Sequence, residues 1–279
     1  MFSIGFIDYF LDEWHANNYP EWIRAKSGGT MSVTHAYAMI DSPKGGRGTE
    51  GWCREMGVQR CRTIDEVIRS CDGLVVLSPD NVEMHEQLCG QPLRSGKPVY
   101  VDKVFAPDLA AAKRFFKLAD ESGTPCYSAS ALRYAREYRS VPRAGIQAIS
   151  SWGPGDIDSY SVHQLEPVVM LMGVPAERVL ALPGRNGVSL SIVFVDGRWA
   201  TVSCFAGESP FAMNLCMEPQ NAAIHVESAF FEEFTAALVA FFIDGKPSVP
   251  HEETLWIMAL REAGMRALAN PCEWISAPR

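Results

Sequence analysis

The stretch Gly96-Lys97-Pro98-Val99-Tyr100-Val101-Asp102-Lys103-Val104-Phe105-Ala106 decides the fold of this chain. Its apolar run, Val99 to Val101, follows a Gly and a Pro, and this pattern predicts a short buried strand. A helix is expected next, from Pro107 to Ser122. Because ligands bind outside the carboxyl ends of the strands in open α/β sheets, Lys103 is expected at a ligand-binding edge. The alternative is a solvated loop lysine paired with Asp102.

The first half of the chain alternates between strand and helix patterns. Strands are expected at residues 2–7, 33–40, 73–77, 99–101 and 125–127, and helices at 14–25, 52–56, 82–94 and 107–122. Thr63 and Glu66 form a capping box that begins a further helix. This alternation predicts a Rossmann-like, doubly wound parallel sheet with right-handed crossovers.

The second half loses this alternation after about residue 128. Strands are expected at residues 146–152, 179–182, 188–195, 199–205, 212–217 and 222–226, and helices at 162–172, 230–243 and 252–268. Asp196-Gly197 is a typical hairpin turn. We therefore expect a first domain over residues 1–127. Residues 128–279 should form an α+β domain with an open, mainly antiparallel sheet, and this domain should include the C-terminal helices.

Composition restricts the class of protein. The 279 residues are 47% hydrophobic and 21% charged, which is typical of a globular protein, and the net charge is −8. An acidic chain of this kind does not favour nucleic acid or an anionic membrane as a partner. The eight cysteines are scattered without zinc-type spacing, so no metal site is expected and a reducing cytoplasm is favoured. No apolar run approaches the ~18 residues of a membrane helix.

The opening stretch resembles a motif of a known family. Gly96-Lys97-x-Val99-x-x-Asp102-Lys103-x-x-Ala106 is similar to the Gly-Lys-x-Val-x-x-Glu-Lys-Pro-x-Ala motif of the glucose–fructose oxidoreductase / inositol dehydrogenase (Gfo/Idh/MocA) family. In that family the lysine contacts both substrate and nicotinamide ribose. Asp102 replaces Glu here, and Val104 replaces Pro. The resemblance implies a cytoplasmic oxidoreductase that acts on a sugar, polyol or related alcohol by hydride transfer with NAD or NADP.

Other positions on the cofactor side follow the same family. Asp41 ends the second strand, where an acid would bind a ribose 2′-hydroxyl, although a turn aspartate is an equal alternative. Ser78, Pro79 and His85 resemble the family's Thr-Pro-x-x-x-His segment, which passes close to the nicotinamide. The alternative for His85 is a residue packed in the first turn of a helix.

The cofactor prediction meets a conflict after the first strand. A dinucleotide-binding fold normally carries Gly-x-Gly-x-x-Gly there, and Asp8, Phe10 and Glu13 occupy the three glycine positions. Bulky side chains would fill the space, and carboxylates would repel a diphosphate. We expect weak or altered NAD(P) binding. The alternative function is a non-redox relative with a degenerate NAD site that serves as a ligand-binding or regulatory subunit.

The catalytic residues of the second domain are also expected from the resemblance. The run from Trp152 to Glu166 is similar to the family's Gly-rich loop leading to Asp-x-x-x-His-x-x-Asp, so that His163 matches the general acid/base and Glu166 the following acid. Removing a hydroxyl proton suits a histidine oriented by a carboxylate. A purely structural pair is the alternative. Substrate contacts are expected from Arg133, Asp158 and Tyr160.

Two further expectations concern reaction and assembly. Lys103 and His163 are expected at the reacting carbon, and they could also support proton transfer, such as epimerisation or elimination, without free NAD. The expected partners are a small-molecule substrate and further copies of this chain. We expect a homodimer or homotetramer formed through the C-terminal sheet.

Overall fold

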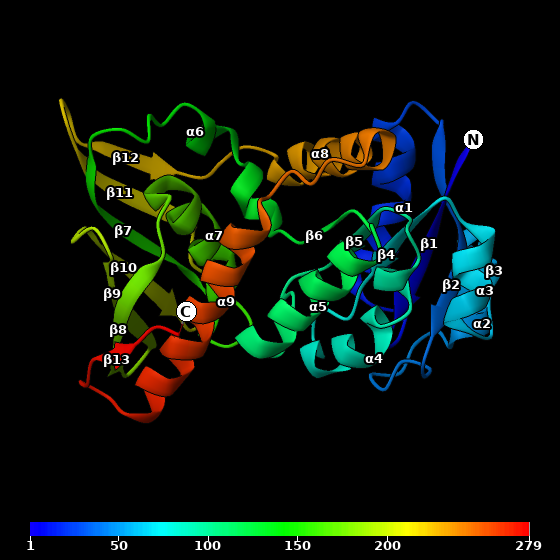
Figure 1. The fold of residues 1–279 in the computed structure, drawn as a ribbon, viewed down its shortest axis with the longest axis horizontal. Helices are drawn as coiled ribbons and strands as arrows, with labels where there is room; N and C mark the ends of the chain where they lie inside the picture. The colour runs from blue at the N-terminus through cyan, green and yellow to red at the C-terminus, as the bar shows by residue number, and fades with distance from the viewer. Residues whose placement is uncertain (279) are drawn as a thin grey trace. The chain divides into compact units, whose positions relative to one another are not determined.

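The computed structural model describes residues 1–278, which form two compact units (Figure 1). The first unit comprises Met1–Ala129 and Phe234–Pro250, and the second comprises Ser130–Glu233 with the chain from His251 onward. The sequence analysis divided the chain between residues 127 and 128 and gave all C-terminal helices to the second domain. Residues 234–250 instead group with the first unit, where Phe234 packs on Tyr19 (ring centroids 5.5 Å apart) and Phe242 on Phe2 (5.8 Å).

The first unit is built on a parallel sheet. Its strands, within residues 1–278, are β1 (Phe2–Asp8), β2 (Met31–Ala38), β3 (Gln59–Arg60), β4 (Gly73–Val76), β5 (Val99–Val101) and β6 (Cys126–Tyr127), in the order β3-β2-β1-β4-β5-β6. Each pair of neighbouring strands in this sheet is parallel. The order reverses between β1 and β4, which makes that edge the topological switch point of a doubly wound fold. The expected fold class is confirmed.

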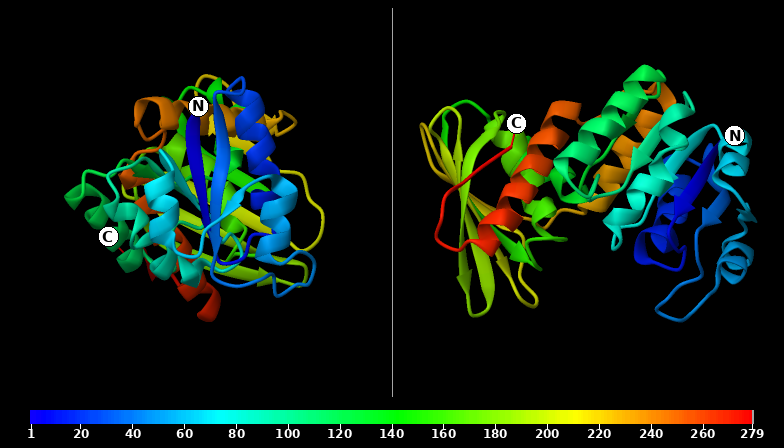
Figure 2. Two further views of the ribbon diagram at one scale, coloured as in Figure 1. Left: turned by 90° about the vertical axis from the view of Figure 1, so that its right-hand side faces the viewer. Right: turned by 60° about the horizontal axis from the view of Figure 1, so that its bottom comes forward.

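Helices complete the first unit. They are α1 (Trp14–Lys26), α2 (Thr49–Met56), α3 (Ile64–Ser70), α4 (His85–Cys89), α5 (Leu109–Glu121) and most of α8 (Phe230–Asp244). The left view of Figure 2 shows β1 and β2 side by side with helices flanking them. Capping residues fix the start of three helices: Glu13 for α1, Thr63 for α3 and Asp108 for α5. The expected capping box at Thr63 is present in part, because the Glu66 N–H donates to Thr63 Oγ1 at 3.2 Å.

One predicted helix is divided into three shorter elements in the structure. Residues 82–94, expected as a single helix, divide into η1 (Val82–Met84), α4 and η2 (Pro92–Arg94). Gly90 ends α4, and Pro92 cannot donate a backbone hydrogen bond to continue it. The break is important because it sets His85 at the start of a short helix rather than in the body of a long one.

The second unit contains a mixed sheet. Its strands, counted in the described chain, are β7 (Ile146–Pro154), β8 (Ala176–Gly184), β9 (Gly187–Phe194), β10 (Trp199–Phe205), β11 (Ala212–Met217), β12 (Ala222–His225) and β13 (Ile275–Ser276), in the order β12-β11-β7-β10-β9-β8-β13. All pairings are antiparallel except that of β10 with β7. The expected antiparallel sheet is thus confirmed, with one parallel pairing that the sequence did not reveal.

Helices cover one face of this second sheet. α7 (Ser161–Met172) and α9 (His251–Ala269) contact the sheet and each other (Figures 1 and 2). Gln164 on α7 donates to the Ser203 carbonyl at 3.0 Å, and Gly264 on α9 lies against Leu190. The short elements η3 (Ala131–Tyr134) and α6 (Arg136–Arg139) precede β7. The buried residues Leu190, Val202 and Cys204 therefore belong to the helix-covered face.

The opposite face of this sheet is uncharged over its four central strands. In the described part of the chain, it presents the residues Ala148, Ser150, Trp152, Val193, Ser191, Ser189, Trp199, Thr201, Ser203, Phe205, Asn214 and Cys216. Hydroxyl pairs cross the strands, with 2.9 Å between Ser150 and Thr201 and 2.6 Å between Ser189 and Ser203. We call these residues the open sheet face. No helix among residues 1–278 has the length and apolar character needed to cross a membrane.

Candidate functional site

Polar side chains gather at the carboxyl edge of the parallel sheet. Asp8 ends β1, Ser78 follows β4, and Asp102 and Lys103 follow β5. Each is buried, with exposed fractions of 1% for Asp8 and Asp102 and 8% for Lys103. β1, β4 and β5 are neighbours in the sheet, so three strands bring these groups to one edge.

Glu13 closes the amino-terminal end of α1. Its carboxylate accepts from the N–H of Ala16 and, at 2.7 Å, from the N–H of His15. A dinucleotide fold offers these free N–H groups to the diphosphate. Here a side chain of the protein already satisfies them, with a negative charge placed favourably at the positive end of the helix dipole.

The same carboxylate holds the His15 imidazole. Glu13 Oε2 lies 3.0 Å from His15 Nδ1, so Nδ1 carries the proton and Nε2 is left on the other side of the ring. Trp14 and Tyr19 pack edge-on against this ring, with centroids 5.1 Å and 5.4 Å away. The imidazole is therefore fixed both in tautomer and in orientation, while its side chain keeps 14% exposure.

Asp102 lies beside the far side of that imidazole. Its Oδ2 is 3.8 Å from His15 Nε2, and this buried atom has no hydrogen-bond partner in residues 1–278. Its Oδ1 accepts from the Tyr100 hydroxyl at 3.1 Å and lies 3.5 Å from that of Tyr19. Burial by itself would lower the pKa of His15, but the charges of Asp102 and Glu13 outweigh it and raise that pKa above its ordinary value.

Asp8 adds a third carboxyl to this edge. Its Oδ1 accepts from the Tyr9 N–H at 2.6 Å, and its Oδ2 is buried without a partner in the described residues. Burial, and after it the charge of Glu13, raise the pKa of Asp8 well above its ordinary value. The protonated form of Asp8 is therefore favoured, which reduces the negative charge that the cluster must hold.

Lys103 has a buried stem and an ammonium with no protein partner. In the part of the chain that the structure describes, it forms neither a hydrogen bond nor an ion pair. The ammonium reaches solvent, while the residue as a whole is 8% exposed. Lys103 lies just after the carboxyl end of β5, as predicted. This group is free to meet a ligand.

The residues at the glycine positions do not fit a dinucleotide diphosphate. Phe10 is 4% exposed and Leu11 1%, so the loop fills its own space with apolar side chains. Asp12 binds Arg47 through Nε at 3.1 Å and Nη2 at 2.6 Å. Together with the Glu13 cap on the N–H groups of His15 and Ala16, these contacts occupy the place that the phosphates take in a dinucleotide fold.

The remaining predicted cofactor residues have partners of their own. Asp41 accepts from the Thr49 N–H at 2.6 Å at the start of α2, and this bond lowers the Asp41 pKa. His85 is fully buried between the carbonyls of Leu77 (2.6 Å) and Phe105 (3.0 Å), and burial lowers its pKa. His85 thus ties together the loops that follow β4 and β5.

Ser78 and Pro79 form the turn that follows β4. Both are buried, and Ser78 Oγ donates to the Asn81 carbonyl at 2.9 Å. Ser78 has φ = +89°, a left-handed conformation that costs a non-glycine residue of order 1–3 kcal/mol. Backbone strain of this kind concentrates at ligand-binding turns, which agrees with the predicted place of this segment beside a ligand.

In the second unit, Ser130 holds His163. Ser130 Oγ lies 2.7 Å from His163 Nδ1, and the ring packs edge-on against Tyr160 at 4.9 Å between centroids. His163 is on the first turn of α7 and is half-buried. The sequence analysis expected a carboxylate to orient this imidazole, and a serine occupies that position on Nδ1.

Glu166 belongs to a buried ion network. Its Oε1 accepts from the Ser130 N–H at 3.1 Å and its Oε2 from Arg133 Nη1 at 3.1 Å, while Arg133 Nη2 pairs with Glu253. Burial raises the pKa of Glu166 despite Arg133, and Arg133 itself is only 7% exposed. The network connects η3, α7 and α9, and through Ser130 it supports the loop that contacts His163.

The other two predicted substrate residues differ in surroundings. Asp158 pairs with Arg261, whose Nε also donates to the Asp158 carbonyl at 2.8 Å. Tyr160 is 41% exposed beside His163. The geometry therefore brings together His163, Tyr160, Glu166 and Arg133, and places the Asp158 carboxylate in an ion pair with α9.

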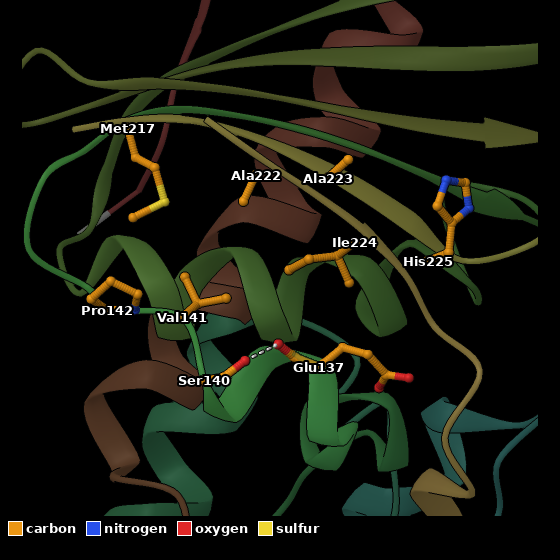
Figure 3. A pocket seen from close by; sticks show the side chains of 9 residues that line it. All are labelled: Glu137, Ser140, Val141, Pro142, Met217, Ala222, Ala223, Ile224 and His225. Atoms are coloured by element: carbon orange, nitrogen blue, oxygen red, sulfur yellow. Dashed lines mark hydrogen bonds between the residues drawn. The ribbon is translucent and has the colours of Figure 1, made fainter. Parts of the chain in front are cut away.

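A shallow pocket elsewhere in the second unit contains none of the predicted residues. It has a volume of about 370 Å³ and lies between β12 and the segment after α6 (Figure 3). Glu137, at its rim, accepts from the backbone N–H groups of Glu227 and Ser228 at 2.9 Å and 2.8 Å. Burial alone would raise the pKa of Glu137. The hydrogen bonds from the Ser228 hydroxyl and from the two backbone N–H groups outweigh burial and lower that pKa to about 2. The carboxylate is thus a structural group.

Sequence reasoning did not find His15, Ser130 or Glu253. His15 is two residues after Glu13, a spacing that lets one carboxylate accept from both the backbone and the ring of the same residue. Ser130 follows the end of β6, as Lys103 follows β5, so its place after a strand was an available signal. Glu253 is far from Arg133 in sequence, and nothing local indicated their pairing. No group of three or more His, Cys, Asp or Glu side chains in residues 1–278 is placed to hold a metal ion.

These features define a Rossmann-type unit followed by a mixed-sheet unit. Residues 31–130 match the model of the GFO_IDH_MocA family, described as an oxidoreductase family with an NAD-binding Rossmann fold. The family resemblance found in the sequence is confirmed, and the matched segment contains Asp41, Ser78, His85 and Lys103. A sequence comparison with curated proteins finds no match.

Solved structures of sugar and polyol dehydrogenases share the fold. Scyllo-inositol dehydrogenase from Lactobacillus casei, solved with NAD(H) and scyllo-inositol, is similar at a TM-score of 0.81 and 14% identity, with 99% of each chain covered. Myo-inositol 2-dehydrogenase from Lactobacillus plantarum has a TM-score of 0.80 and 14% identity, with 99% of each chain covered. UDP-N-acetylglucosamine 3-dehydrogenase from Acidithiobacillus ferrooxidans has a TM-score of 0.77 and 10% identity, covering 95% of this chain and 97% of that one. At these identities the likeness shows the fold alone.

The buried network around Arg133 generates a stability prediction. Arg133→Met leaves the carboxylates of Glu166 and Glu253 buried without their cation, so the free energy of unfolding at pH 7 should fall by about 3–5 kcal/mol. The loss should shrink as the pH is lowered, because protonation of the carboxyls removes the unpaired charges. Urea unfolding at several pH values measures this effect.

The matched control is Arg139→Met. Arg139 also pairs with a glutamate, Glu233, at 3.0 Å, but its side chain is 58% exposed. Such a pair contributes about 0–1 kcal/mol. Equal losses for the two variants would contradict a structural role for the buried network.

Proposed function

We propose that the protein acts on a sugar, polyol or related alcohol as an oxidoreductase, with Lys103 and His163 as the residues that act on the substrate. The observation that carries this proposal is the Lys103 ammonium, which has a buried stem and no protein partner at the carboxyl edge of the sheet. The family match and the dehydrogenases that share the fold support it.

Each residue has a distinct task in this proposal. The Lys103 ammonium donates to the oxygen at the reacting carbon. His163, whose Nδ1 lies 2.7 Å from Ser130 Oγ, takes the hydroxyl proton of the substrate as general base. Tyr160, exposed beside the imidazole, contributes a further hydrogen-bonding group. A nicotinamide would be the hydride acceptor, and it would have to bind without the usual diphosphate contacts.

A second candidate is favoured by the Glu13 cap. Because Glu13, Phe10 and the Asp12–Arg47 pair occupy the diphosphate position, the protein could bind a small ligand without redox chemistry. It would then be a ligand-binding or regulatory relative of the dehydrogenases. Nucleotide affinity separates the two candidates.

The first test is a calorimetric titration with NAD(H) and NADP(H). Because a diphosphate would meet the Glu13 carboxylate in place of free N–H groups, the Kd should exceed roughly 100 μM, weaker than about −5.5 kcal/mol. Low-micromolar affinity would contradict this reading of the loop. Nicotinamide-dependent turnover on a panel of sugars and polyols supports the oxidoreductase, and its absence across the panel favours the ligand-binding candidate.

The second test concerns the substrate residues. Loss of a positioned general base costs 10²–10⁴-fold in rate, so His163→Ala and Lys103→Ala should each lower kcat/KM by at least ~100-fold. The melting temperature should change little, and this is measured on the same samples. If the substitutions lower stability but leave turnover within a few-fold, the two residues are structural.

We also propose that two or more copies of the chain associate through the open sheet face. This face is uncharged, so it can meet an identical face without like-charge repulsion, although the chain carries a net charge of −8. Trp199 is 50% exposed and Phe205 42%, and aromatic side chains of this kind are enriched in interfaces.

A charge at the centre of the open sheet face should separate the copies. Thr201→Arg places like charges opposite each other in a two-fold interface and should convert a dimer or tetramer to a monomer. Light scattering measures the mass in solution. Ala110→Arg, at an exposed position on α5, is the control that should leave the mass unchanged. A wild-type monomer would contradict the proposal.

A further inference from the structure

Three groups lie at the carboxyl edge of the first sheet, and the proposed hydride transfer uses only one of them, the Lys103 ammonium. They are the Glu13–His15 pair, the Asp102 carboxylate and the Lys103 ammonium. All belong to the first unit: Asp102 Oδ2 lies 3.8 Å from His15 Nε2, and Lys103 follows Asp102 directly after β5. In a dinucleotide fold the diphosphate would lie where Glu13 holds the His15 imidazole.

The imidazole has the arrangement of a general base. Glu13 fixes the proton on Nδ1 at 3.0 Å, which leaves Nε2 as the atom that can accept a proton. Trp14 and Tyr19 pack edge-on against the ring.

The groups around Nε2 match a ligand that both donates and accepts hydrogen bonds. The buried Asp102 Oδ2 lacks a partner in residues 1–278 and requires a donor, such as a hydroxyl. The Lys103 ammonium lacks a partner there as well and requires an acceptor, such as a carbonyl oxygen. A compound with a carbonyl next to a hydroxyl-bearing carbon supplies both.

We propose that Glu13, His15, Asp102 and Lys103 form a proton-transfer centre that enolises a hydroxy-carbonyl compound without a dinucleotide. His15 Nε2 takes the proton from the carbon next to the carbonyl. The electron pair of that C–H bond becomes the C=C bond of the enediol, and the π pair of the carbonyl moves onto its oxygen, which Lys103 holds. Return of a proton from the His15 imidazolium to the same face of that carbon restores the compound, and in D₂O it introduces deuterium there. Neither an oxidant nor a reductant is consumed.

This proposal does not rest on the oxidoreductase reaction. It requires no nicotinamide and does not involve His163, so either proposal can fail while the other stands. It also explains the filled loop: a diphosphate would compete with Glu13 for the N–H groups at the start of α1, and would release the carboxylate that orients His15.

Deuterium exchange tests the centre directly. The full chain is incubated in D₂O, without NAD(P), with dihydroxyacetone, D-xylulose or D-fructose, and loss of the C–H signal next to the carbonyl is followed by proton NMR. Exchange above the protein-free rate is expected for at least one compound. His15→Gln, whose amide can still donate to Glu13, should lower that rate at least ~100-fold.

Two further variants make the outcome decisive. Lys103→Met should also abolish exchange, and it serves as the second variant if His15→Gln does not fold by circular dichroism. His225→Gln makes the same change at an exposed position on β12 and should stay within twofold of wild type. The proposal is overturned if wild type exchanges none of the three compounds, or if folded His15→Gln or Lys103→Met exchanges as fast as wild type.

Discussion

The Glu13 carboxylate at the amino-terminal end of α1 is the interaction on which the site of the first unit depends. A helix end offers N–H groups and a positive dipole to any nearby anion. In a dinucleotide fold the anion is the diphosphate of the cofactor, and here it is a side chain two residues before His15. The Glu13 carboxylate accepts hydrogen bonds from the N–H groups of His15 and Ala16 at this helix end. The same carboxylate also holds the His15 imidazole.

The charge balance at this edge follows from the replacement. Asp8, Glu13 and Asp102 are all nearly buried, and three negative charges in so small a volume would be strongly unfavourable. Burial and the charge of Glu13 raise the pKa of Asp8, and the Lys103 ammonium at the same edge opposes the negative charge of the carboxylates. Within residues 1–278, Asp8 Oδ2, Asp102 Oδ2 and the Lys103 ammonium still lack hydrogen-bond partners.

The sequence predicted the fold well because local signals and the global pattern agreed. Apolar runs such as Val99–Val101, the capping residue Thr63 and the Asp196-Gly197 turn each specify one local structure. The helix expected at residues 82–94 failed because Gly90 and Pro92 were outweighed by the apolar pattern around them. The sequence predicted where the site lies, since Asp8 ends β1 and Lys103 follows β5. It did not predict which side chains contact each other there. The Arg133–Glu253 pair and the approach of His15 to Asp102 join residues distant in sequence, and only tertiary packing brings them together.

The two histidines differ in how they are oriented, and this difference bears on their chemistry. His15 has a carboxylate on Nδ1, which stabilises the imidazolium formed when Nε2 takes a proton. His163 has the Ser130 hydroxyl there, a neutral group that fixes the ring without favouring its charged form to the same degree. The acid expected to assist His163, Glu166, instead binds Arg133 and the Ser130 N–H. The contacts that orient the two imidazoles therefore differ in charge: a carboxylate lies on Nδ1 of His15 and a hydroxyl on Nδ1 of His163.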